Sequence, residues 1–193
     1  MNLGQTFFEY RSYTPIPFLV MMAIFAHPTI VSLIAGAAIV LSGEFLRLWG
    51  VSIAGSETRT TGPVGGTFLI TTGPFAHVRN PLYVGNVMMY FGFGVMSMAL
   101  FPWLALAALC FFMFQYSLIV SNEEKYLSER FGEEYQRYVQ SVPRFFPSIR
   151  RYDGKAGEQP SLDWKRGLQS EKRTLEAVVL LSLVVCVLFF VKG

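Results

Sequence analysis

Residues 73–85, GPFAHVRNPLYVG, place rigid and polar side chains directly before a long apolar run. The residue before a proline is biased towards extended backbone, so Asn80-Pro81 predicts that Pro81 opens a helix. The first backbone N–H groups of that helix have no intrahelical partner, and Arg79 stands beside them. Such a helix start can bind an anionic or polar ligand group. The alternative interpretation is an interfacial loop with a snorkelling Arg79 and an interfacial Tyr83.

Two adjacent carboxylates, Glu123 and Glu124, form the second candidate. They follow the fourth apolar run, where the dipole at a helix C-terminus favours cations and disfavours carboxylates. A local cost of this kind can mark a functional position. A carboxylate placed there can receive a ligand ammonium, a ribose hydroxyl or the field of a sulfonium. The alternative interpretation is a solvated, charged helix face.

A basic residue between aromatic residues and prolines, Arg144 in the stretch VPRFFP at 142–147, is the third candidate. Its guanidinium can contact the polar head group of a substrate, and the segment can act as a lid. The same composition is also typical of an anchor at the membrane interface.

Other ionisable and metal-binding residues are few. Glu44 stands three residues before Arg47, so the two charges can neutralise each other on one helix face, although ionisable groups at membrane depth are functional candidates. His27 and His77 each lack a neighbouring histidine, and the two cysteines lie in separate apolar runs. We therefore expect neither a metal site nor a disulfide framework.

The composition predicts that lipid is the main solvent of the chain. Apolar residues make up 52% and charged residues 15%, whereas soluble domains carry about 25% charged residues. The first of the apolar runs is too short to cross a hydrocarbon core of about 30 Å. Either its helix starts near Ser12, or it forms a hairpin with the second run that does not reach fully across. The predicted membrane segments are about 15–26, 29–50, 83–100, 102–121 and 174–191.

The basic residues predict an orientation. Fifteen of the sixteen lysines and arginines are Arg11 or lie within 47–82 and 122–173. The positive-inside rule therefore places the N-terminus and both polar segments in the cytoplasm. We assign this charge to contacts with anionic lipids and expect no nucleic-acid partner, because no basic face with stacking aromatic residues is present. The sequence also has no Walker loop, GxSxG elbow or HExxH motif.

The polar segment after the fourth run predicts a helical block. Aromatic residues recur at helical spacing within 122–150, Gly132 interrupts two short helices, and Pro143 ends the second. Residues 151–173 are rich in Gly, Pro and charge and predict a linker or a surface segment. The fold class is therefore an all-α polytopic membrane protein, with about five transmembrane helices and a helical cytoplasmic block before the last helix.

Taken in this order, the three candidates resemble the isoprenylcysteine carboxyl methyltransferase and phospholipid methyltransferase superfamily. The resemblance covers the chain from about Gly43 to Pro147. It implies an integral membrane methyltransferase domain over 1–193, with a motif-bearing core at about 43–147 and an extra helix at about 174–191. The matching motifs are RNPLYVG at 79–85, the pair Glu123-Glu124, FGEEYQRY at 131–138 and VPRFFP at 142–147.

The resemblance implies S-adenosylmethionine as the cofactor, in a cytoplasm-facing pocket, and a lipophilic substrate that enters from the bilayer. Methyl transfer from a sulfonium is an in-line displacement that depends mainly on positioning and a desolvated approach. Arg79 and Glu124 are candidate catalytic residues, and Arg144 is a candidate substrate contact. By match, the cofactor-binding residues are Thr67, Phe68, Leu69, Ile70, Phe75, Asn80, Pro81, Leu82, Tyr83 and Glu123.

Three departures from the pattern leave the acceptor open. Phe75 stands where the family usually has tyrosine, and Asn80 replaces a histidine common in the prenylcysteine enzymes. Ile119 occupies the place where those enzymes carry an arginine suited to a substrate carboxylate. An amine head group or another lipophilic acceptor is therefore comparably compatible. An NADPH-dependent membrane reductase of the sterol reductase type and a non-catalytic membrane scaffold are the alternative functions.

Overall fold

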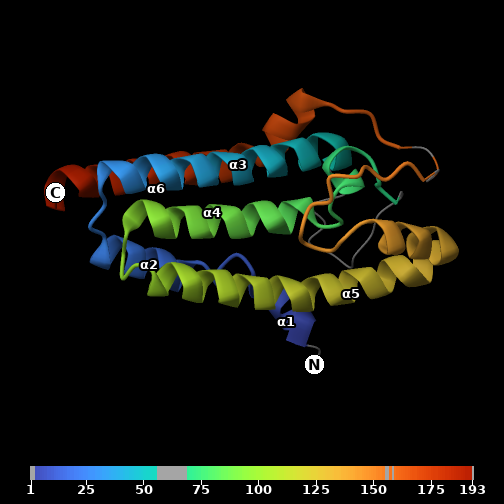
Figure 1. Ribbon diagram of the computed structural model, residues 1–193, viewed down its shortest axis with the longest axis horizontal. Coiled ribbons are helices and arrows are strands. Elements are labelled where there is room, and N and C mark those ends of the chain that lie inside the picture. Colours follow the sequence, from blue (N-terminus) through green and yellow to red (C-terminus); the bar gives the residue numbers. More distant parts are fainter. Residues whose placement is uncertain (1–2, 56–68, 155–156, 158, 193) are drawn as a thin grey trace.

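The computed structural model describes residues 3–55, 69–154, 157 and 159–192, which form helices and loops without a strand (Figure 1). Four long helices run side by side along the molecule, with the two short N-terminal helices packed beside them. This confirms the predicted all-α fold class. The elements are α1 (Leu3–Tyr10), α2 (Ile16–Phe25), α3 (Ile30–Ala54), the short 3₁₀ helix η2 (Gly73–Ala76), α4 (Pro81–Ser97), α5 (Trp103–Ser141) and α6 (Trp164–Lys192).

Helices α3 and α4 form the closest pair because glycines face each other between them. A Cβ atom added to Gly43 would lie 2.7 Å from the carbonyl oxygen of Gly85, and one added to Gly36 would lie 2.6 Å from that of Gly92. Small residues at such contacts allow helix backbones to approach closely inside a membrane. The pairing also sets the register between α3 and α4, one turn before Arg47 and beside Asn86.

Three helices, α3, α5 and α6, are long and apolar enough to cross a membrane. The 17 residues of α4 span about 26 Å and the 10 residues of α2 about 15 Å, so the predicted count of five membrane helices is not confirmed. Because α2 begins at Ile16, its helix does not start near Ser12; α2 falls short of a full span, whereas its hairpin partner α3 is long enough to cross. The turn of that hairpin meets the end of α4, where the His27 backbone N–H donates to the Ser97 carbonyl oxygen at 3.0 Å.

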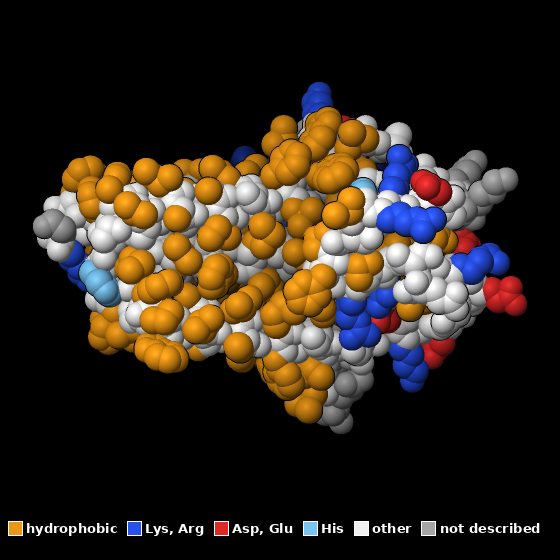
Figure 2. Space-filling model, in the orientation of Figure 1, with side chains coloured by type: hydrophobic (Ala, Val, Ile, Leu, Met, Phe, Trp, Pro, Cys, Tyr) orange, Lys and Arg blue, Asp and Glu red, His pale blue; other side chains and the backbone are white. Residues whose placement is uncertain are grey.

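The surface is divided between an apolar shaft and a charged end. Figure 2 shows apolar side chains over most of the length, while lysine, arginine, aspartate and glutamate gather towards the end that holds the loop before α4 and the last part of α5. Large exposed side chains such as Leu180 and Phe190 on α6 are the kind that contact lipid chains. The chain is an integral membrane protein.

Helix α5 continues beyond its apolar part into the charged end. Its 39 residues reach Ser141, and Gly132 has a left-handed, non-helical backbone (φ 51°, ψ −124°) inside it. The predicted break at Gly132 and the predicted helical block are therefore present. Glycine takes this conformation at low cost, which explains why the bend falls at this residue.

The last helix begins at Trp164, about ten residues earlier than the predicted bound of 174. Of the two predictions for 151–173, the linker is therefore wrong for the final part, whereas most residues of 164–173 are exposed, as a surface segment requires. Long-range packing stabilises the added turns: a Cβ atom on Gly167 would lie 2.0 Å from the Ser52 Oγ, and the Glu171 side chain pairs with Arg47. Neither partner is visible from the local charge pattern.

Candidate active site

A half-open cavity of about 950 Å³ lies between the helices, and its wall extends from the charged end into the apolar shaft. Small-molecule sites in proteins usually occupy roughly 300–1,000 Å³, so the cavity is large enough for a cofactor or substrate. Thr67 and Phe68 lie outside the described residues, and Arg144 contacts Glu124 behind the wall. The predicted site residues in the wall are Leu69, Ile70, Phe75, Arg79, Asn80, Pro81, Leu82, Tyr83, Glu123 and Glu124.

The loop before α4 is fixed to the segment that follows α5. Helix α4 begins at Pro81, as the sequence predicts, with Asn80 at its N-cap. The Asn80 Nδ2 donates to the Arg144 carbonyl oxygen at 3.2 Å, and the Arg79 backbone N–H donates to the Pro143 carbonyl oxygen at 2.9 Å. The first and third sequence candidates are therefore packed against each other, so that 142–147 braces the start of α4.

Glu124 holds two guanidinium groups. Its Oε1 accepts from Arg79 Nε at 3.0 Å and from Arg79 Nη2 at 2.8 Å, and it also accepts from Arg144 through both carboxylate oxygens. Arg79 Nη1 donates further to the carbonyl oxygens of Val139 at 3.1 Å and Val142 at 2.8 Å. This charged clamp joins the α4 loop to the end of α5. The predicted catalytic roles of Arg79 and Glu124 stay a prediction, and the contacts assign them a positioning role.

Glu123 faces the cavity beside the clamp. The Tyr83 hydroxyl donates to Glu123 Oε1 at 2.7 Å, across 40 positions of sequence. The Tyr83 ring also contacts the Tyr116 ring, with centroids 4.7 Å apart. A carboxylate has acceptor capacity on both oxygens, so Glu123 can accept from Tyr83 and from a bound ligand together.

The end of α5 covers the charged side of the cavity with tyrosines. The Tyr138 hydroxyl donates to the Phe75 carbonyl oxygen at 2.6 Å and its ring meets Tyr152 edge-on at 5.3 Å. Tyr138 lies beyond Gly132 and outside the apolar segment. Burial raises the pKa of its hydroxyl well above the ordinary value, so this group is a neutral donor. Gln159 closes the adjacent edge by donating to the Leu69 carbonyl oxygen at 2.9 Å.

A second cluster of polar side chains in the cavity wall was only partly predicted from the sequence. Arg47 Nη2 donates to Glu171 Oε2 at 2.7 Å and Arg47 Nη1 donates to Asn86 Oδ1 at 2.6 Å. Asn86 Nδ2 donates in turn to the Tyr116 hydroxyl at 3.1 Å. We name Arg47, Asn86, Tyr116 and Glu171 the polar belt, and all four line the cavity.

The predicted pair of Glu44 and Arg47 exists, but it is the longer of the two ion pairs at 3.9 Å. Glu171 was missed because it fell in the segment taken for a linker. A sequence signal was present: Glu171, Val178 and Val185 are buried at a spacing of seven residues, so they lie on one face of α6. Extending that pattern backwards from the apolar run predicts an inward-facing carboxylate.

Together these features define a class of protein: a helical membrane protein with a half-open cavity that joins a charged, aromatic end to an apolar shaft. Residues 31–134, over half of the chain, match the model of the phospholipid methyltransferase family. The chain belongs to this family. The resemblance inferred from the three sequence candidates is thereby confirmed.

Curated relatives align with a similar part of the chain. The cobalt-zinc-cadmium resistance protein CzcN of Cupriavidus metallidurans is 34% identical over 113 residues, 57% of this chain and 46% of that protein. The nickel-cobalt-cadmium resistance protein NccN of Alcaligenes xylosoxydans xylosoxydans is 39% identical over 53% of this chain and 44% of its own length. The methanethiol S-methyltransferase of Pseudomonas deceptionensis is 32% identical over 62% and 45%. The chain thus spans less than half the length of these relatives, and no solved structure matches it significantly.

Proposed function

We propose that this protein is an S-adenosylmethionine-dependent methyltransferase that acts on a lipophilic acceptor at the cytoplasmic face of a membrane. One observation carries the proposal: Asn80–Tyr83 and Glu123, which are about forty positions apart in sequence, meet in the wall of a single cavity. Family membership supports the reaction class, and one relative is named as a methyltransferase for a thiol. We treat the whole chain as one domain built on the core at 43–147.

The cavity wall offers groups that fit this cofactor. Glu123 presents a carboxylate for an ammonium or a ribose hydroxyl, and the first turn of α4 directs backbone N–H groups towards a ligand carboxylate. Phe75 and Tyr135 supply aromatic rings that can stack on an adenine ring or make a cation–π contact with a positively charged group. The cofactor, when bound, supplies a methyl group on a positively charged sulfur.

The chain contributes the positioning of the reacting groups. The clamp around Glu124 holds the α4 loop against α5, so that Asn80 and Tyr83 keep their places in the wall. Tyr138 and Gln159 fasten the charged side of the cavity to the backbone of Phe75 and Leu69. A fixed site increases the fraction of encounters with in-line geometry.

The deeper wall fits an acceptor with an apolar tail. Met89 and Phe93 on α4 and Leu181 on α6 line the cavity on its apolar side. Ile119, which stands where prenylcysteine enzymes have an arginine, is buried and is not part of the wall. We therefore propose that the acceptor is lipophilic and that a prenylcysteine carboxylate is not its recognition element.

Neither alternative function gains support from the described site. A reductase that binds a nicotinamide dinucleotide phosphate needs cations for its phosphates, yet the candidates Arg79 and Arg144 are both engaged by Glu124. A non-catalytic scaffold is expected to fill its former pocket with side chains, and a cavity of about 950 Å³ is present instead.

We place the site on the cytoplasmic side because of the charge distribution. Lysines and arginines cluster with the charged end, whereas Lys192 at the opposite end donates to the carbonyl oxygens of Ala23 and Ile24. The positive-inside rule assigns the richer end to the cytoplasm. The same basic residues are proposed to contact anionic lipid head groups.

The direct test is equilibrium binding of labelled S-adenosylmethionine to the purified protein in neutral-lipid nanodiscs, followed by lipid extraction after incubation with membranes. We expect saturable binding and transfer of the label to an apolar product. Glu133→Ala, an exposed acidic residue of the same helix, is the matched control for Glu123→Ala. Absence of saturable binding by the wild type overturns the proposal, and so does equal binding by the Glu123→Ala and wild-type proteins.

A further inference from the structure

The corner between α1 and α2 places a cation in the wall of the cavity. Arg11 lies in this corner, and its guanidinium carbon is 3.8 Å from the centre of the Phe8 ring. Its Nη1 also donates to the Phe8 carbonyl oxygen. A guanidinium has five N–H donors, so these contacts hold the group in place and leave it able to donate to a ligand.

Close packing holds α1 on the helix that carries Glu123. A Cβ atom added to Gly4 of α1 would lie 2.7 Å from the Leu118 carbonyl oxygen of α5. This contact is five residues before Glu123 along the chain. The corner that follows α1 is therefore fixed relative to that part of the cavity wall.

Arg11 acts on Glu123 without touching it. Its positive charge attracts the Glu123 carboxylate, which also accepts from the Tyr83 hydroxyl. Both side chains line the cavity, yet they form neither a hydrogen bond nor an ion pair with each other. A cation and an anion thus share one cavity at a separation larger than that of a direct contact, and a ligand that carries both charges can bridge them.

The cofactor of the proposed function carries such a pair of charges. The amino-acid end of S-adenosylmethionine has an ammonium and a carboxylate on one carbon atom. Glu123 can accept from the ammonium while Arg11 donates to the carboxylate, and hydrogen bonds between ionised groups are the strong ones.

The other three arginines of the wall are less suited to this carboxylate. Two of them are already bound to carboxylates of the chain, at 2.8 Å for Arg79 and at 2.7 Å for Arg47 of the polar belt. Arg173 on α6 is exposed, so water and salt weaken its attraction for a ligand. Arg11 is half-buried and is held by an aromatic ring.

We propose that Arg11 binds the carboxylate at the amino-acid end of the cofactor and makes the cavity selective for S-adenosylmethionine over ligands that lack this group. The assignment rests on the proposed function. Arg11 lies outside the region 31–134 that matches the family, so the family resemblance does not predict this role. The corner after α1 thereby completes the cofactor site built by α4 and α5.

The test compares S-adenosylmethionine with its decarboxylated form, which keeps the ammonium and the sulfonium. Equilibrium binding of each is measured at pH 7 to the full chain in phosphatidylcholine nanodiscs, with empty nanodiscs subtracted. A hydrogen bond to a charged group changes binding by about tenfold to a hundredfold. We expect the wild type to prefer S-adenosylmethionine by at least about tenfold, and Arg11→Gln to bind the two ligands about equally.

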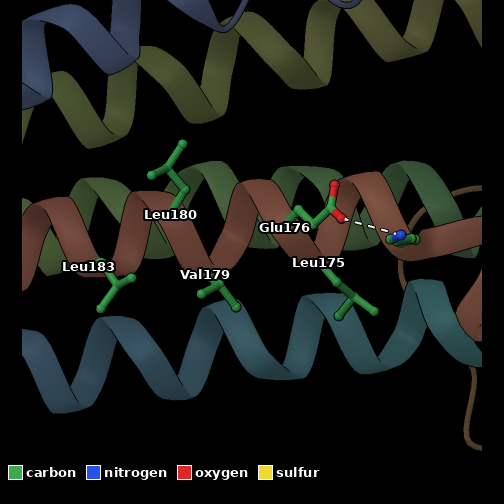
Figure 3. Close-up of a pocket in the computed structure, with 6 residues that line it drawn as sticks. Leu175, Glu176, Val179, Leu180 and Leu183 are labelled. Atoms are coloured by element: carbon green, nitrogen blue, oxygen red, sulfur yellow. Dashed lines mark ion pairs between the residues drawn. The ribbon is translucent and has the colours of Figure 1, made fainter.

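Lys172→Gln is the control for the loss of one positive charge. Lys172 is 76% exposed and pairs with Glu176 at 3.9 Å. Figure 3 shows Glu176 beside a shallow apolar groove of about 410 Å³, which shares no lining residue with the cavity. We expect this control to keep the preference of the wild type.

Equal binding of the two ligands by the wild type overturns the proposal, and so does an unchanged preference in Arg11→Gln. A preference that falls as far in Arg173→Gln also overturns it, because the effect would then belong to the general charge of the cavity. Should Arg11→Gln fail to fold, Arg11→Lys keeps the charge but removes the planar set of donors. Its preference is expected to fall by about threefold, and an unchanged preference overturns the assignment.

The same measurement separates this proposal from the proposed function. A wild-type protein that binds neither ligand refutes the methyltransferase. Binding of both ligands without preference refutes only the role of Arg11.

Discussion

Replacing Glu124 by glutamine tests whether the clamp positions the α4 loop. Glu124 accepts two hydrogen bonds from Arg79, whose side chain is 10% exposed, and it also accepts from Arg144, which is 37% exposed. Removing one partner of a buried ion pair costs about 3–5 kcal/mol. The pair with Arg144 is more exposed to solvent and adds only about 0–1 kcal/mol. We therefore expect a loss of about 3–5 kcal/mol in the stability of this contact region.

The loss is expected to be local. Hydrogen exchange measured by mass spectrometry should show faster exchange in 73–80 and in 142–148, because Arg79 and Asn80 connect these segments. Binding of S-adenosylmethionine should weaken by about a hundredfold or more, since 1.4 kcal/mol corresponds to a factor of ten. Glu133→Gln on the exposed face of α5 is the control for the loss of one carboxylate.

A purely catalytic Glu124 would give a different pattern. In that case Glu124→Gln would lower the rate at saturating cofactor, while exchange in the two segments and cofactor affinity would match the wild type. Observing that pattern would refute the positioning role and leave the catalytic assignment in place.

Three further changes test other parts of the structure. Tyr83→Phe removes the donor at 2.7 Å from Glu123 and is expected to weaken S-adenosylmethionine binding by about tenfold, measured by equilibrium dialysis; unchanged affinity would remove this pair from the site. Gly43→Ala forces a Cβ atom to 2.7 Å from the Gly85 carbonyl oxygen. The resulting overpacking should lower the free energy of unfolding by about 1–3 kcal/mol and Tm by about 3–10 °C. An unchanged Tm would contradict the close contact. Glu129→Cys, in a variant without the two native cysteines, is expected to react with a membrane-impermeant maleimide only in inside-out vesicles; labelling in right-side-out vesicles would reverse the proposed orientation.

Local signals in the sequence were enough for several features. Pro81 and the residue before it set the start of α4, and Gly132 set the bend in α5, because backbone restrictions act within a few residues. The meeting of Tyr83 with Glu123 was predicted only through the family resemblance. Spacing alone does not place side chains forty positions apart in one wall.

Features that depend on distant contacts were harder to predict. The early start of α6 and the role of Glu171 depend on Ser52 and Arg47, more than a hundred residues away in sequence. The sequence shows five apolar runs, yet only three of the described helices have the length and hydropathy expected of a membrane span. The helices α2 and α4 are shorter, because turns end them at Phe25 and Ser97. A charged stretch such as 164–173 can be a loop or a helix, and the sequence does not decide between them until the residue that pairs with its buried charge is known.

The glycine contacts between α3 and α4 have a consequence for how such a site can diversify. Two backbones that touch at Gly43 and Gly85 act as a rigid spine, since neither helix can slide or tilt without a steric collision. The flanking helices α1, α2 and α6 contribute residues such as Phe8, Leu19 and Leu181 to the cavity wall. Substitutions in these helices can therefore change which ligand the site accepts, while the paired helices α3 and α4 keep the reactive geometry fixed.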